Sequence, residues 1–247
     1  MVKGIDRFKA YFRDYTDQYV LIGGAACDIS FGSNNAEFRA TRDLDVVLIA
    51  EALTREFGQR FCEFIRDGGY QNRAKSSGAS QFYRFDKPTQ EGFPAMIELF
   101  ARTEYILEDG AELTPIHIDD SISSLSAILL NDSYYDALLR GRDVIDGFSI
   151  LRHSWLIPFK AKAWLDLNER NRRGEHVGSR NLKKHRNDII RMAAELVLER
   201  CELPEEVKSD MANFIEEMNV TDQEIRNLKL RGVKAEDIRR LLTDMYL

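Results

Sequence analysis

The sequence predicts an α/β (α+β) fold, with a mixed β-sheet core flanked by helices and followed by a helical domain. In the first half of the 247-residue chain, short apolar runs bounded by glycine and proline turns alternate with stretches of helical periodicity. From about Ser149 the apolar residues recur mainly at spacings of three and four, as one face of a helix requires. We therefore place a first domain at residues 1–148 and a helical domain at residues 149–247.

The elements of the first domain follow in order. Phe8–Phe12 belongs to an initial helix, and the apolar run Tyr19–Ile22 is a strand that ends at Gly23–Gly24, where a short helix begins. Asp43–Ile49 is the next strand. Apolar residues on one helical face predict a helix over Thr54–Asp67, which Gly68–Gly69 ends. Further strands are predicted at Gln81–Phe85, Ala95–Ala101 and Ile116–Ile118.

The helical domain has recognisable helix starts. Leu156 to Leu167 fits a helix packed on the core. Pro204 stands at an early helical position, where its missing N–H costs nothing. Thr221, with Glu224 three residues later, is the pattern of a capping box.

Three acidic residues are the candidate catalytic and metal-binding groups. Asp43 and Asp45 are two residues apart on one strand, so their side chains project to the same face. Two carboxylates in one place repel each other unless a cation lies between them, which suits Mg²⁺. Glu98 interrupts the apolar run Ala95–Ala101, where a lone carboxylate is costly to bury. It is either a third metal ligand or half of a salt bridge to Arg84 or Arg102.

Gly23 and Gly24 are the candidate phosphate-binding turn. Without a Cβ, the backbone can turn sharply and approach a ligand closely. If a helix begins at Ala25, its first N–H groups point at that ligand and favour a negative charge.

The order of these motifs resembles the nucleotidyltransferase superfamily of the DNA polymerase beta type. In that family a glycine-rich helix start holds phosphates, two acidic residues on one strand bind metal, and a third acidic residue lies on a neighbouring strand. The resemblance implies a nucleotidyltransferase-like sheet and a two-metal Mg²⁺ site formed by Asp43, Asp45 and Glu98, with a nucleoside triphosphate (NTP) as the donor.

A narrower resemblance is to the abortive-infection nucleotidyltransferase toxins of the AbiEii type. It is carried by Arg39 and Thr41 ahead of the two aspartates, and it implies that both lie at the nucleotide site. Arg39 then either pairs with a phosphate or holds Asp43 in position, and the sequence favours neither role over the other.

Two later motifs extend the same resemblance into the helical domain. Lys160 precedes Ala163 by three positions, and Lys184 precedes Asp188 by four. The resemblance implies that these two lysines and Asp188 take part in nucleotide binding. His185 departs from the pattern, because that position is often aspartate in the family.

These observations lead to one main hypothesis and two alternatives. The main hypothesis is a Mg²⁺-dependent nucleotidyltransferase that moves a nucleoside monophosphate from an NTP to an acceptor hydroxyl and releases pyrophosphate. By resemblance the acceptor is tRNA, another RNA or a protein, and an antitoxin is a possible partner. The alternatives are a small-molecule acceptor of the aminoglycoside kind, and a non-catalytic nucleotide-binding module of a toxin–antitoxin pair.

Charge and composition limit the classes of partner and the cellular location that we expect. The formal net charge is −6, which argues against a broad nucleic-acid-binding surface. A local exception is the segment 170–186, with seven basic residues against one acidic residue. It either steers a triphosphate or an RNA end, or is a solvated helix connection. No apolar run reaches the ~20 residues of a membrane span and the N-terminus lacks a signal-peptide pattern, so we expect a cytoplasmic protein.

Overall fold

The computed structural model describes residues 2–75, 81–102, 128–129 and 131–247, and the strand predicted at Ile116–Ile118 lies outside these residues. Two compact units are present. Unit 1 contains residues 2–75, 81–102 and 142–152, and unit 2 contains 128–129, 131–141 and 153–247. The mixed α/β class with a separate helical part is therefore confirmed.

Unit 1 is built on a seven-stranded mixed sheet with the strand order β3-β4-β5-β2-β1-β7-β6. The strands are β1 (Tyr19–Ile22), β2 (Asp43–Leu48), β3 (Tyr70–Lys75), β4 (Gln81–Pro88), β5 (Met96–Ala101), β6 (Arg142–Ile145) and β7 (Phe148–Leu151). The central strand β2 is antiparallel to β1 and parallel to β5, so β2 and β5 begin at the same edge of the sheet. β4 is antiparallel to β5 and ends at that edge.

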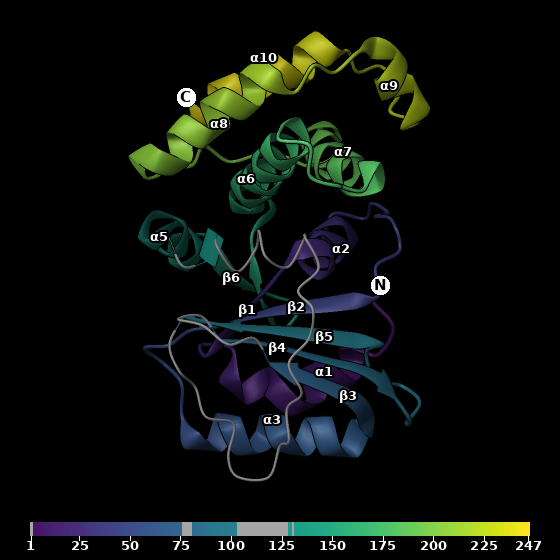
Figure 1. Ribbon diagram of the computed structural model, residues 1–247, viewed down its shortest axis with the longest axis vertical. Helices are drawn as coiled ribbons and strands as arrows, with labels where there is room; N and C mark the ends of the chain where they lie inside the picture. The colour runs from purple at the N-terminus through teal and green to yellow at the C-terminus, as the bar shows by residue number, and fades with distance from the viewer. Residues whose placement is uncertain (1, 76–80, 103–127, 130) are drawn as a thin grey trace. The chain divides into compact units, whose positions relative to one another are not determined.

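Helices cover the sheet of unit 1. They are α1 (Ile5–Phe12), the 3₁₀ turn η1 (Arg13–Tyr15), α2 (Gly23–Ser33) and α3 (Arg55–Gly68). In Figure 1, α1 and α3 lie together along one side of the sheet. Their aromatic faces form one cluster, in which the ring of Phe12 lies 5.4 Å from that of Phe64 and Phe61 lies 5.6 Å from Phe85 of β4. This cluster anchors the buried face of the sheet.

The ends of α3 follow from its sequence. The Thr54 hydroxyl accepts a hydrogen bond of 3.2 Å from the Phe57 N–H, which satisfies one of the unpaired donors of the first turn. At the other end Gly69 has φ 60°, the left-handed conformation that closes a helix.

A cut between residues 148 and 149 does not match the division of the chain in the structure. Phe148–Leu151 is strand β7, which lies between β1 and β6 in the unit 1 sheet. The hairpin signal is Asp146–Gly147, both at positive φ, between the apolar pair Val144–Ile145 and the mainly apolar run Phe148–Leu151. Unit 2 in turn includes residues before this hairpin, among them helix α5 (Asp132–Gly141).

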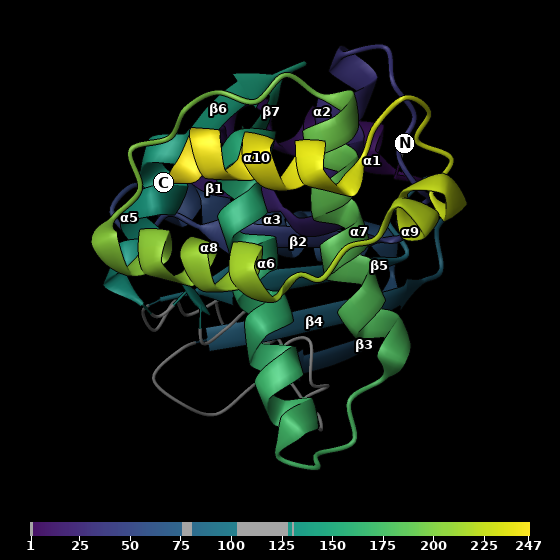
Figure 2. The ribbon, with the colours of Figure 1, turned by 90° about the horizontal axis from the view of Figure 1, so that it is seen from above.

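Unit 2 consists of helices in its described part. They are α5 (Asp132–Gly141), α6 (His153–Arg172), α7 (Ser179–Glu195), α8 (Glu205–Glu217), α9 (Asp222–Asn227) and α10 (Ala235–Tyr246). Figure 2 shows α8 and α10 running alongside each other. The capping box predicted at Thr221 and Glu224 is present at the start of α9. None of the helices described in either unit is both long and apolar enough to cross a membrane.

Candidate active site

The register of three neighbouring strands places two carboxylates and a guanidinium in one row. Asp45 of β2 is opposite Glu98 of β5, and Glu98 is opposite Arg84 of β4. Residues opposite each other in a sheet project to the same face. The structure therefore brings Asp45 and Glu98 together, as predicted from the sequence.

A second row lies two residues along the same strands. Asp43 is opposite Met96, and Met96 is opposite Asp86. Because side chains alternate along a strand, this row shares a face with Asp45, Glu98 and Arg84. Phe85 lies between Arg84 and Asp86 on β4, so its side chain projects to the opposite face of the sheet, where it contacts Phe61 of α3. The carboxylates therefore lie on the face that α3 does not cover.

Glu98 lies in a buried, negatively charged setting. Only 8% of the residue is exposed. Arg84 donates two hydrogen bonds to Glu98 Oε1, from Nε at 2.9 Å and from Nη2 at 2.6 Å. Burial and the neighbouring Asp45 carboxylate nevertheless raise the pKa of Glu98 to about 8, with Asp43 adding to the effect and Arg84 opposing it.

The two glycines lie against the side chains that the sequence assigned to the same site. Gly23 has φ 65°, and a Cβ at this position would be 1.9 Å from Asp45 Oδ2. A Cβ on Gly24 would be 2.5 Å from Thr41 Oγ1. The N-cap residue of α2 is Ile22, whose apolar side chain makes no capping hydrogen bond, so the first N–H groups of the helix suit an anion.

Arg39 lies on the loop between α2 and β2. Its guanidinium carbon is 5.0 Å from the centre of the Phe38 ring, and that ring is 5.0 Å from Phe31 of α2. This stacking holds the loop that carries Thr41 against α2. Whether Arg39 binds a phosphate remains a prediction.

The donor set suits a hard divalent cation in its chemistry. Asp43, Asp45 and Glu98 supply oxygen ligands, and Arg84 is the positive charge that the structure shows bound to Glu98. The raised pKa of Glu98 reflects its burial and the neighbouring Asp45 carboxylate, and a bound cation would favour the ionised form of Glu98 again. Within the described residues, no group of three or more His, Cys, Asp or Glu residues is already arranged as a metal site.

Two of the three candidate residues of unit 2 pair with each other. Lys160 of α6 donates a hydrogen bond of 2.8 Å from Nζ to Asp188 Oδ2 on α7. Their side chains are only 6% and 1% exposed, so this ion pair joins two helices inside unit 2. Lys184 is exposed on α7. A nucleotide-binding role for these three residues remains a prediction.

Acidic partners neutralise much of the basic segment 170–186. Arg170 pairs with Glu175, Arg172 with Glu217 and Arg173 with Glu169. Arg186 pairs with Glu224 of α9. These contacts fit a solvated helix connection better than a surface that steers an RNA.

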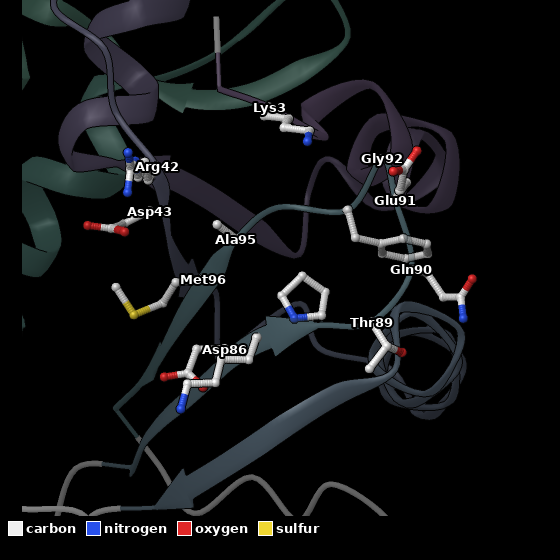
Figure 3. A pocket seen from close by; sticks show the side chains of 13 residues that line it. Lys3, Arg42, Asp43, Asp86, Thr89, Gln90, Glu91, Gly92, Ala95 and Met96 are labelled. Carbon is white, nitrogen blue, oxygen red and sulfur yellow. The ribbon is translucent and has the colours of Figure 1, made fainter.

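A pocket of about 540 Å³ opens beside Asp43, at the sheet edge where β2 and β5 begin and β4 ends (Figure 3). Its walls come from the start of the chain, from the residues around Asp43 and from the β4–β5 turn. The lining residues are Lys3, Arg42, Asp43, Asp86, Lys87, Pro88, Thr89, Gln90, Glu91, Gly92, Phe93, Ala95 and Met96.

Sequence reasoning did not assign Asp86, Lys3 or Arg42 to the site. Asp86 stands two residues after Arg84, the same spacing as Asp43 and Asp45. This spacing indicates that Asp86 shares a face of its strand with Arg84. Its position opposite Met96 depends on the pairing of β4 with β5, which only the structure shows.

A scan against protein-family models and a search of curated proteins found no match. Solved structures that resemble this chain include JHP933 from Helicobacter pylori, with 13% sequence identity and a TM-score of 0.42 over 98% of this chain and 87% of that one. Another is an antigenic nucleotidyltransferase-like protein from Paracoccidioides brasiliensis, with 17% identity and a TM-score of 0.39 over 94% and 96% of the two chains.

A third structure, the GLD-2/RNP-8 complex, aligns with 98% of this chain and 68% of its own, at 8% identity and a TM-score of 0.27. All three likenesses are distant.

Proposed function

We propose that unit 1 is a Mg²⁺-dependent nucleotidyltransferase that transfers a nucleoside monophosphate from an NTP to an acceptor hydroxyl. The observation that carries this proposal is the meeting of Asp45 with both Gly23 and Glu98, next to Asp43. At this meeting point the N-terminus of α2, which suits phosphates, lies next to a group of carboxylates that suits a metal ion. The resemblance in motif order supports the same activity.

Each residue of the site has a role in this reaction. Asp43 and Asp45 would hold Mg²⁺, which supplies charge stabilisation at the transferred phosphoryl group. Gly23, Gly24 and the N-terminus of α2 bind the triphosphate. The acceptor oxygen bonds to the α-phosphorus as the bond to the bridging oxygen breaks, and pyrophosphate leaves. With a pKa of about 8, Glu98 is ionised at mildly alkaline pH, and in that form it can take the proton from the acceptor hydroxyl.

Different observations favour different acceptors for this reaction. Resemblance to the AbiEii-type toxins favours tRNA, another RNA or a protein, together with an antitoxin partner. The pocket beside Asp43 favours a small molecule instead. A nucleotide-binding module without catalysis is the remaining candidate, and the Arg84–Glu98 ion pair supports it because it offers a purely structural role for Glu98.

The test is transfer of label from each α-labelled NTP, with Mg²⁺ and a panel of RNA, protein and small-molecule acceptors. Asp43→Asn and Asp45→Asn should each reduce transfer by at least ~100-fold, because they remove charge that stabilises the transition state. Asp14→Asn is the matched control, since the Asp14 side chain is 79% exposed and belongs to η1, which contributes no residue to the site described above. NTP binding by calorimetry without transfer to any acceptor would refute the enzyme and support the binding module.

A further inference from the structure

The pocket beside Asp43 lies on the side of the carboxylates away from the glycine turn. In the strand order β4-β5-β2-β1, the pocket draws on β4, β5 and the start of β2, whereas Gly23 follows β1. Asp43 and Asp45 on β2 stand between the two. An in-line displacement needs the acceptor and the leaving pyrophosphate on opposite sides of the transferred phosphorus. With pyrophosphate at the glycines, the acceptor belongs in the pocket.

We propose that this pocket is the acceptor site, that it takes a small polyhydroxyl molecule bearing an amino group, and that Asp86 recognises the amino group. The proposal rests on the nucleotidyl transfer proposed for unit 1. The volume of about 540 Å³ lies within the ~300–1,000 Å³ typical of small-molecule sites.

Asp86 carries an unused hydrogen-bond acceptor at this pocket. Its Oδ1 atom is buried and makes no hydrogen bond within the described part of the chain. A buried acceptor without a donor has lost its hydrogen bonds to water, and a ligand that donates to it restores that lost interaction. An ammonium group supplies both the donor and the opposite charge. In Figure 3, Asp86 and Asp43 lie on the same side of the pocket, with Met96 between them.

The rest of the lining favours a compact molecule over a nucleic acid. Three cationic residues, Lys3, Arg42 and Lys87, are balanced by three acidic residues, Asp43, Asp86 and Glu91. A polyanion binds where positive charge is in excess, and the described residues of this lining carry no such excess. Apolar atoms of Ala95, Met96, Pro88 and Phe93 complete the lining and can contact the carbon skeleton of a ring.

Glucosamine and glucose form a matched pair of probes, because they differ at one position in an amino group against a hydroxyl. 2-Deoxystreptamine adds a second amino group, and total cellular RNA tests the polymer alternative. Transfer should reach the two amino compounds in preference to glucose. Asp86→Asn should raise the KM for glucosamine at least tenfold and leave the KM for the NTP within twofold. Asp146→Asn, an exposed aspartate in the β6–β7 turn, should change neither.

Binding of the same probes, measured by ligand-observed NMR, tests the pocket separately from transfer. Binding of glucosamine that Asp86→Asn weakens supports the site even where no transfer occurs, in which case only the nucleotidyltransferase proposal fails. Label that enters RNA or protein alone overturns the acceptor proposal. An unchanged KM in Asp86→Asn, or the absence of binding by every small probe, overturns it equally.

Discussion

Asp45 Oδ2 lies 1.9 Å from the place that a Cβ would occupy on Gly23. The backbone of the turn and the carboxylate therefore share a space that admits no side chain, and the glycine is what lets them meet. The positive φ of 65° at Gly23 adds a second reason for glycine.

Gly23→Ala should destabilise unit 1 by about 2 kcal/mol, from backbone strain and from displacement of Asp45, and should abolish transfer. Gly32→Ala is the matched control in the same helix, because a Cβ there meets nothing within 4 Å. That control should be neutral or more stable by about 0.5–1 kcal/mol, owing to the better helix propensity of alanine. Urea unfolding measures both variants, and equal effects would contradict this account of Gly23.

The raised pKa of Glu98 makes stability depend on pH. The ordinary pKa of this carboxyl is 4.5, and the folded value is about 8. Between these values the unfolded chain releases the proton and the folded chain keeps it, so stability falls as pH rises. This contribution is complete below about pH 4.5 and is lost above about pH 8. Glu98→Gln should flatten the profile across that interval, in urea midpoints recorded from pH 4 to 9. A slope unchanged in the variant would show that another group is responsible.

Arg84 opposes the rise in the Glu98 pKa, so its removal should raise that pKa further. In Arg84→Met the basic form of Glu98 is reached only at higher pH. The acidic limb of the pH–kcat profile should therefore move to higher pH. Arg84→Lys keeps the charge and loses the paired hydrogen bonds, and it should restore part of the shift. A profile that keeps its position while activity falls would instead assign Arg84 to another role.

The Lys160–Asp188 ion pair should contribute strongly to unit 2. Lys160→Met leaves the buried carboxylate without its ammonium, which should cost about 3–5 kcal/mol. Lys160→Met combined with Asp188→Leu should cost less than the sum of the single changes. Arg173→Ala removes an exposed ion pair with Glu169 and should change stability by less than about 1 kcal/mol. If Lys160→Met behaves like Arg173→Ala in thermal unfolding, the pair is not structural.

The two-residue period of a strand was enough to place Asp43 and Asp45 on one face, and a lone acid in an apolar run was enough to single out Glu98. Neither pattern specifies which strands become neighbours. The contact of Glu98 with Asp45 and the row through Arg84 depend on β5 lying between β2 and β4, a long-range pairing. The strands β3 and β6 escaped prediction because Gln71, Asn72, Arg142 and Asp143 break any alternation of apolar and polar residues.

The acceptor pocket could not be predicted for a related reason. Its walls combine Lys3, the start of β2 and the turn between β4 and β5, which are far apart in the sequence. These segments line one pocket only because strand pairing brings them to the same edge of the sheet. The pairing of Lys160 with Asp188 likewise depends on how α6 packs on α7, although the spacing of each motif was visible.

Strands β6 and β7 return to unit 1 after helix α5 of unit 2, and β7 completes the sheet beside β1. On the ribosome, the strand that leads into the glycine turn therefore waits for a neighbour that emerges more than 120 residues later. The nascent sheet has an unpaired edge at β1 until residue 151 has left the exit tunnel. The two units are thus not made one after the other, and a chain stopped after α5 would expose a strand edge prone to association.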